Sequence, residues 1–232
     1  FIDLTLRTEK QLQAIIDEAR AQPSAPGTPA QQIADMHASY MDTARRNALG
    51  VSMLLPELTD ILNVADRREI ARRMGSIGYT AIVDASVAQD SDHPDRHALT
   101  LEQSGLGLPG RDYYLKKEEP YAGFRVAYAN YIEGVFARAG VPGGRSRAAA
   151  ILAFETAVAR AHWTPAMERD AVRNHHPMSV HALHRHAPGF DWPAFLGAAG
   201  FGDARRVDLR NDSAIRAMAA LFARTPVETL RG

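Results

Sequence analysis

Apolar residues recur every three or four positions along most of this 232-residue chain, and one segment breaks that pattern. Between residues 79–90 and 96–103 they alternate instead, around a polar QDSDHPDR loop, which predicts a β-hairpin. The sequence therefore predicts a mainly α fold, a multi-helix domain with a small antiparallel β-hairpin near 80–103. The predicted helices cover residues 8–20 with Thr8 as N-cap, 28–49 with Thr28 as N-cap, 56–62, 66–77, 120 to the GVPGG segment, 145–163, 179–186, 191–199, 212–224 and 226 onward.

The composition excludes several classes of function. Lys plus Arg equals Asp plus Glu at 27 each, so the chain lacks the basic excess of a nucleic-acid-binding domain, and we expect no nucleic-acid partner. The absence of cysteine excludes disulfides, thiolate nucleophiles and cysteine-based zinc sites. The chain begins with Phe1 rather than Met, and we expect it to be part of a longer protein.

Residues 105–110 read GLGLPG, which has the glycine spacing of a dinucleotide-binding loop. In such a loop an apolar helix and then a second parallel strand follow the glycines. Here Pro109 precedes the third glycine, and RDYYLKKEEP is not a helix that packs on a sheet. We therefore expect no nucleotide partner and assign the stretch a structural role.

The structural interpretation makes specific predictions for this stretch. Gly105 and Gly107 are expected to supply backbone freedom, and Pro109–Gly110 to form the centre of a type II turn. Leu106 and Leu108 should point into a core. Asp112 is expected to cap the following turn or to pair with Arg111, while Tyr113 and Tyr114 act as bulky anchors.

The longer stretch QSGLGLPGRDYYL, residues 103–115, resembles a signature of the neprilysin-like (M13) zinc metallopeptidases. Further segments match that family in order along the chain: YMD at 40–42, LPEL at 55–58, the helix from Leu152 through Glu155 and Ala159 to AHWT at 161–164, RD at 169–170, PMS at 177–179, PGFDW at 188–192 and TPVETL at 225–230. The structural signature comprises Gly105, Gly107, Pro109, Arg111, Asp112, Tyr113 and Tyr114.

The resemblance implies that residues 1–232 form most of a helical N-terminal domain that caps a C-terminal zinc catalytic domain and encloses a substrate cavity. The parent protein would then be a zinc metalloendopeptidase that hydrolyses oligopeptides. In the family, two His of H-E-x-x-H and a downstream Glu bind zinc. The partners implied are that catalytic domain and peptide substrates. The expected location is extracytoplasmic, either periplasmic or membrane-anchored and facing outward.

This chain contains no H-E-x-x-H, so we assign it no catalytic residue, no metal ligand and no cofactor, and zinc is expected only in the parent protein. His93 and His97 are four apart, but HPDRH lacks the glutamate. In the family, basic and acidic residues that flank an F-D-x-L-R segment near the first helix hold a substrate's C-terminal carboxylate, and this segment aligns with Phe1 to Thr5. Ile2 and Thr5 replace its Asp and Arg, so no substrate-binding residue is assigned.

Three other features are candidates for chemistry or packing. The NHHPMSVHALHRH stretch, residues 174–186, is rich in histidine but has no interleaved carboxylate, and we expect no metal there. The residues Tyr121, Tyr128 and Tyr131 are expected to form a core stripe. Arg169–Asp170, like Arg111–Asp112, is expected to lock a loop. An alternative to the peptidase interpretation is a stand-alone helical binding module with no enzymatic role.

Overall fold

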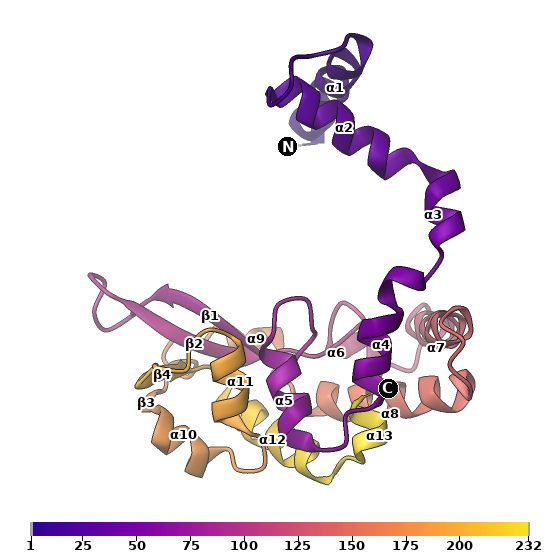
Figure 1. Cartoon of the computed structure of the whole chain (residues 1–232). Coiled ribbons are helices and arrows are strands. Elements are labelled where there is room, and N and C mark those ends of the chain that lie inside the picture. The colour runs from indigo at the N-terminus through magenta and orange to yellow at the C-terminus, as the bar shows by residue number, and fades with distance from the viewer. Residues whose placement is uncertain (1, 232) are drawn as a thin grey trace. The chain divides into compact units, whose positions relative to one another are not determined.

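A computed structural model describes residues 2–231. Its contacts divide the chain into a first unit, residues 1–55, and a second unit, residues 56–232. Each unit is described by itself (Figure 1). Phe1, at which the aligned F-D-x-L-R segment starts, lies outside the described residues.

The first unit consists of short and medium helices. They are α1 (Ile2–Ala21), α2 (Pro29–Met41), α3 (Thr43–Leu49) and the 3₁₀ helix η1 (Ser52–Leu54). Within this unit α1 packs against α2. The predicted helix 28–49 begins as expected, with the Thr28 hydroxyl accepting a hydrogen bond from the Gln31 N–H, but it is broken at Asp42. Asp42 caps α3 instead, because its carboxylate accepts a hydrogen bond from the Arg45 N–H at 2.8 Å.

The predicted start of the first helix is wrong. Thr8 lies inside α1 rather than at its N-cap, and its hydroxyl donates a hydrogen bond to the Leu4 carbonyl oxygen one turn earlier, at 2.9 Å. A threonine in a helix interior satisfies its hydroxyl in this way, so its presence does not require a helix start.

The second unit contains the remaining helices and all four strands that the described residues form. The helices are α4 (Leu55–Leu62), α5 (Arg67–Gly75), α6 (Arg111–Leu115), α7 (Tyr121–Arg138), α8 (Gly144–Ala161), α9 (Pro165–Glu168), α10 (Val180–His186), α11 (Trp192–Ala198), α12 (Asp212–Arg224) and α13 (Val227–Leu230). The mainly α class is therefore confirmed. Two short helices, α6 and α9, were not predicted.

The predicted hairpin is confirmed, but it belongs to a larger sheet. Strands β1 (Val83–Gln89) and β2 (His97–Gln103) pair in antiparallel register, with Val83 opposite Gln103. Strands β3 (Pro177–Ser179) and β4 (Arg206–Leu209) complete a sheet of order β1-β2-β4-β3. Since β4 pairs parallel to β2, the sheet is mixed, which the sequence did not indicate. Strands of three and four residues are too short to show a period of two.

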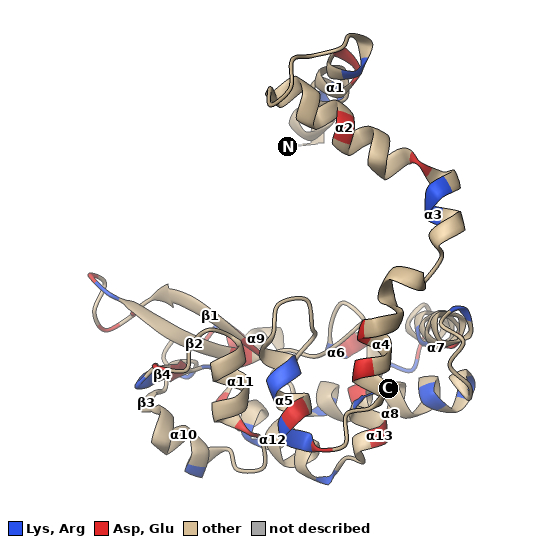
Figure 2. Cartoon of the chain, in the orientation of Figure 1, with Lys and Arg blue, Asp and Glu red and all other residues tan. Residues whose placement is uncertain are grey.

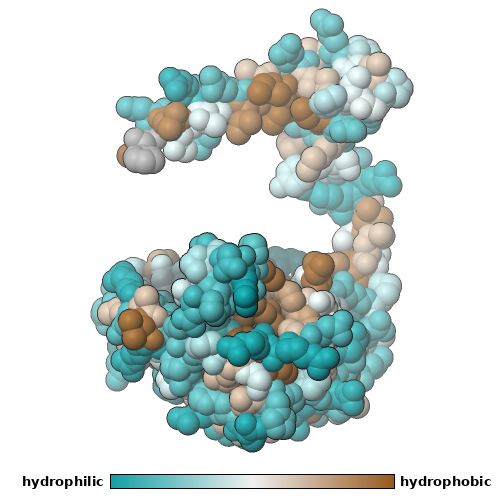
Figure 3. Space-filling model, turned by 90° about the vertical axis from the view of Figure 1, so that its left-hand side faces the viewer, coloured by the Kyte–Doolittle hydropathy of each residue, from teal (hydrophilic) through white to brown (hydrophobic). Residues whose placement is uncertain are grey.

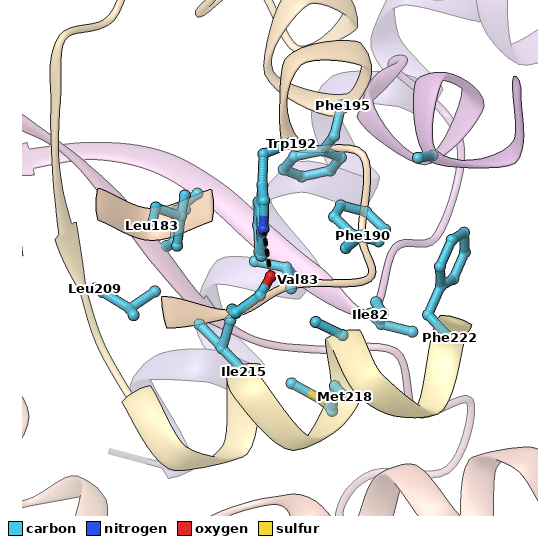
Figure 4. Close-up of a cluster of buried hydrophobic side chains, with 14 of the residues drawn as sticks. Ile82, Val83, Leu183, Phe190, Trp192, Phe195, Leu209, Ile215, Met218 and Phe222 are labelled. Carbon is cyan, nitrogen blue, oxygen red and sulfur yellow. Dashed lines mark hydrogen bonds between the residues drawn. The ribbon is translucent and has the colours of Figure 1, made fainter. Parts of the chain in front are cut away.

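A hydrophobic core lies between the sheet and the helices α11 and α12. Figure 4 shows Phe190 between Trp192 and Phe195 of the α11 region and Phe222 of α12, and the Phe190 ring centroid lies 4.9 Å from those of Trp192 and Phe222. The buried Trp192 indole N–H donates to the Ala187 carbonyl oxygen at 2.9 Å, so its one polar atom is satisfied.

The surface of the second unit carries charges of both signs, as on α5 (Figure 2), where Arg72 and Arg73 both pair with Glu69. The predicted tyrosine stripe on α7 is only partly internal: Tyr131 is 63% exposed, and Ile132 is the buried residue of that helix. Among the described residues, no helix combines the length and apolar character needed to cross a membrane.

Candidate functional site

The signature loop, residues 104–110, leads from the end of β2 to the short helix α6. Its start is fixed by the side chain of Gln103, whose Oε1 accepts a hydrogen bond from the Trp163 N–H at 2.7 Å. The Gln103 N–H donates to Asn211 Oδ1 at 3.2 Å, and the Ser104 carbonyl oxygen lies 3.0 Å from His162 Nε2. The loop is thereby held against the end of α8 and the start of α12, segments far away in the sequence.

Two glycines of the loop are required for different reasons. Gly105 has φ +90°, and a Cβ there would lie 2.8 Å from the Ile82 Cα. This agrees with the predicted need for backbone freedom. Gly107 has no positive φ, so the prediction of backbone freedom is wrong for it. It is required for space, because a Cβ would lie 1.9 Å from the Tyr128 hydroxyl oxygen.

Glu155 of α8 gathers the polar atoms beneath this loop. Its Oε2 accepts a hydrogen bond from the Tyr114 hydroxyl at 2.6 Å, and its Oε1 accepts one from the Tyr128 hydroxyl at 3.0 Å. The Tyr114 oxygen accepts in turn from the Leu108 N–H at 2.8 Å. The loop backbone, α6, α7 and α8 are thus joined through one carboxylate.

Burial shifts the acidity of this network. It raises the pKa of Glu155, although the two tyrosine hydroxyls that donate to the carboxylate oppose the shift. Burial is also the main reason that the pKa values of Tyr114 and Tyr128 are raised, and the neighbouring Glu155 raises them further. The tyrosines therefore stay protonated and act as donors, and both carboxylate oxygens are occupied.

Pro109 and Gly110 do not form the predicted type II turn. That turn needs a positive φ of about +80° at its second central residue, whereas Gly110 has φ 172°, which is extended backbone. Gly110 is the N-cap residue of α6, and no side chain caps the start of this helix. The predicted inward side chain of Leu106 is confirmed, since it packs against the core. Leu108 is not among the residues that pack there, and it holds the loop through its N–H.

The predictions for Arg111 and Asp112 are wrong. Asp112 neither caps the turn nor pairs with Arg111; its carboxylate lies 3.0 Å from Lys116 Nζ on the surface, one turn along. Arg111 Nε is buried without a hydrogen-bond partner. Tyr113 and Tyr114 are anchors as predicted: Tyr113 lies edge-on to Tyr121 at 5.4 Å, and Tyr114 is only 5% exposed. The Arg169–Asp170 lock is also absent, since Asp170 accepts from the Arg173 N–H.

A cavity of about 460 Å³ opens beside the signature loop. Residues from two regions of the chain line it, 103–111 on one side and His162, Trp163, Pro165 and Glu168 on the other. Burial lowers the pKa of His162, so this imidazole is neutral near pH 7. Arg111 and Glu168 are the charged residues of the lining, and the Gln103 amide donates a hydrogen bond to Glu168.

One histidine of the histidine-rich stretch, His175, lines a second cavity of about 400 Å³ together with Asp92 and Asp208. His175 lies between Asp208, 3.0 Å from Nδ1, and Asp92, 3.1 Å from Nε2. His176 Nδ1 faces the Leu209 carbonyl oxygen, and His181 is exposed on α10. The described residues include no group of three or more His, Asp or Glu side chains placed to hold a metal. They therefore do not fit a zinc ion, and the absence of zinc from this chain remains a prediction.

The arrangement around the signature loop can support structure and recognition, but it places no nucleophile beside a free base. Sequence reasoning missed Glu155 as the centre of the network and His162 as a cavity residue. A signal for Glu155 was present. It lies four residues after Ile151 and so falls on the predicted apolar face of α8, where an acid needs partners.

Comparisons with known proteins place this mainly helical domain with its glycine-rich loop in a known class. The family model described as "Peptidase family M13" matches residues 1–232. Endothelin-converting enzyme 1 of Cavia porcellus is 36% identical over 115 residues, and neprilysin-2 of Caenorhabditis elegans is 28% identical over 120 residues. The chain belongs to peptidase family M13 and corresponds to its N-terminal region.

Solved structures agree with this assignment. The Mycobacterium tuberculosis zinc metalloprotease Zmp1 in complex with an inhibitor matches 100% of the chain, with a TM-score of 0.87 and 30% identity. PepO from Lactobacillus rhamnosis matches 92% of the chain at a TM-score of 0.63 and 15% identity, which shows the shared fold. The chain spans only 36% of the Zmp1 chain. The alignment with endothelin-converting enzyme 1 covers 47% of this chain and 15% of that enzyme.

Proposed function

We propose that the parent of this chain is a zinc metalloendopeptidase that hydrolyses oligopeptides. The observation that carries the proposal is the match of the entire chain to family M13 and to a zinc metalloprotease structure of which it covers about a third. The described residues form no group of three or more metal-binding side chains, and the proposal assigns the metal and the chemistry to another part of the parent.

In this proposal the chain serves as the helical cap of the catalytic domain and encloses the substrate cavity. Support comes from the second unit, which has a core of its own and a signature loop fixed by Glu155 and Gln103. A rigid cap of this kind restricts access by size, so short peptides reach the catalytic centre and folded proteins do not. The proposed extracytoplasmic location rests on the family resemblance, and protease accessibility in intact cells tests it.

The test compares the full-length parent with the 232-residue chain. A quenched peptide library should be cleaved by the parent, the cleavage should stop on addition of a chelator, and zinc should restore it. The chain alone should give only background, with or without zinc. Turnover that survives the chelator would contradict the zinc mechanism, and chelator-sensitive turnover by the chain alone would contradict the assigned role. A parent that binds peptides but never cleaves them would support the binding-module alternative.

The capping role needs its own measurement. The parent should cleave an unfolded polypeptide segment when it is presented as a short peptide, but not when the same segment is a loop of a stable folded protein. Equal rates on both substrates would show that the domain does not restrict access.

A further inference from the structure

Four arginines of the second unit have a buried Nε without a hydrogen bond, Arg67, Arg111, Arg210 and Arg231, and Arg111 is the one among them that has no other carbonyl or carboxylate partner in the described residues. Its Nε is buried without a hydrogen bond, and no carboxylate of the described residues lies within ion-pair distance of its guanidinium. Other arginines of the same unit are satisfied: Arg125 donates to the Tyr113 and Lys116 carbonyl oxygens at 2.7 and 2.8 Å, and Arg72 pairs with Glu69.

An unpaired guanidinium in this position is energetically unfavourable. Arginine cannot release its proton at neutral pH, so burial does not neutralise it as it neutralises His162. The Nε of Arg111 is shielded from water and has no protein acceptor, so this nitrogen loses hydration without gaining a hydrogen bond. The loop geometry nevertheless holds Arg111 at the wall of the 460 Å³ cavity, next to glycines that leave the backbone uncovered.

The cavity has the chemistry of a carboxylate site. A guanidinium presents a planar fork of N–H donors that matches a carboxylate with two parallel hydrogen bonds. His162 is turned toward the Ser104 carbonyl oxygen and does not compete for the anion. Glu168 also lines the cavity and repels an incoming carboxylate, and the hydrogen bond from Gln103 fixes its position, so a bound anion has to lie on the Arg111 side. The volume accommodates a whole acidic side chain.

We propose that this cavity is a docking site for an Asp or Glu side chain from the catalytic part of the same polypeptide. The inference rests on the proposed function, which gives the parent a catalytic domain packed against this one. The chain spans 36% of the Zmp1 structure that it resembles, so most of such a parent lies outside these residues. A partner on the same polypeptide is present at a high effective concentration, which suits a site built around one charge pair.

The test uses Arg111→Met, which keeps the length of the side chain and removes its charge, in both the 232-residue chain and the full-length parent. In the chain alone the variant should melt at the same temperature as the wild type or higher, because a guanidinium with an unsatisfied, buried Nε is removed. In the parent the effect should reverse. Hydrogen exchange of the amides in residues 104–110 should become about tenfold faster, as expected when one charge-assisted hydrogen bond is lost. Arg111→Lys should retain part of the protection.

Arg160→Met is the matched control, because Arg160 is an exposed residue of α8 with no partner in the structure. It should change exchange in neither protein. Destabilisation by Arg111→Met in the chain alone would show that Arg111 supports the domain itself and would overturn the proposal. Unchanged exchange in the parent would overturn it as well. Hydrogen exchange does not depend on catalysis, so a parent without peptidase activity would refute the proposed function while this measurement still decides the docking site.

Discussion

The signature loop and the histidine-rich stretch are both unusual in sequence, yet the loop is tied into one network, whereas the stretch places His175 in a cavity with Asp92 and Asp208 and leaves His181 exposed. In the loop, small residues let helices approach, and Tyr114, Tyr128 and the backbone meet at Glu155. In residues 174–186 the chain passes from strand β3 into helix α10, and the change in periodicity sends the histidines in different directions. Many residues of one type within a segment therefore indicate a site less well than side chains from several helices and strands that can meet at one point.

The largest effect should follow from filling the space at Gly107. Gly107→Ala places a Cβ 1.9 Å from the Tyr128 hydroxyl oxygen and displaces a hydrogen bond to Glu155. Overpacking and the lost bond together should cost about 2–4 kcal/mol in the free energy of unfolding. Gly110→Ala is the control, because its Cβ would meet nothing within 4 Å and its φ is 172°. Urea unfolding of both variants checks this, and equal losses would contradict the role of space at Gly107.

The next effect concerns the carboxylate itself. Glu155→Leu keeps the approximate volume but leaves the partly buried hydroxyls of Tyr114 and Tyr128 without their acceptor, at a cost of about 1–3 kcal/mol. Glu155→Gln retains an acceptor and should lose less. Thermal melts of the two variants measure the difference, and a Leu variant as stable as the wild type would show that the network contributes little.

A smaller, pH-dependent effect is expected from the histidine-rich stretch. The hydrogen bonds and charges of Asp208 first, and Asp92 second, raise the pKa of His175 above 6.5. A raised pKa in the folded state adds stability that is fully present below pH 6.5 and is lost as the pH rises through the raised value. Asp92 is exposed and screened by salt, so most of the contribution, on the order of 1 kcal/mol, should come from the buried Asp208.

Stability curves between pH 5.5 and 8.5 for the wild type and His175→Gln test this effect at one ionic strength. The gap between the curves should be largest at the acidic end and close toward the basic end. His181→Gln, at an exposed position with no partner in the structure, should run parallel to the wild type. A gap that widens with pH would contradict the assignment.

The smallest effect should come from Asp112→Ala, although this residue belongs to the signature. Its carboxylate pairs with an exposed Lys116 one helical turn away, and such surface pairs contribute little. The melting temperature should be nearly unchanged at low salt, and the remaining difference should vanish at high salt. A large loss would show that Asp112 has a buried role that its geometry does not indicate.

The parts of the fold that could be predicted are those with a long, regular pattern. Helices such as α8 and α12 and the β1–β2 hairpin follow directly from apolar spacing. The parallel pairing of Thr100 with Asp208 could not be predicted, because the four residues of β4 are too few to show a period and the two strands are more than a hundred residues apart. The prediction for Asp112 was wrong for a related reason. A preference for capping depends on the nearest residues only, whereas the Asp112 carboxylate pairs with Lys116, four residues further along the helix.

The sequence predicted where the structural signature lies in the chain, but not which contacts hold its residues in place. Gly107 was recognised as indispensable for the wrong reason, because sequence shows that a glycine is present but not which atom lies against it. Tyr131 was assigned to the core from its spacing with Tyr128, yet the two lie about 60° apart around a helix, far enough for one to face Glu155 and the other to be exposed.

The order of the sheet also has a consequence for synthesis on the ribosome. The β1–β2 hairpin can form as soon as residue 103 has emerged, but β2 remains an open edge on its other side until β4, residues 206–209, has been made. During that interval the apolar residues of β2 lack the helices that later cover them, since Phe190, Trp192 and Phe222 are all translated afterwards. Nascent chains that extend past residue 103 but not yet to residue 209 therefore expose this strand edge, and these are the chains that chaperones must protect from strand-edge association.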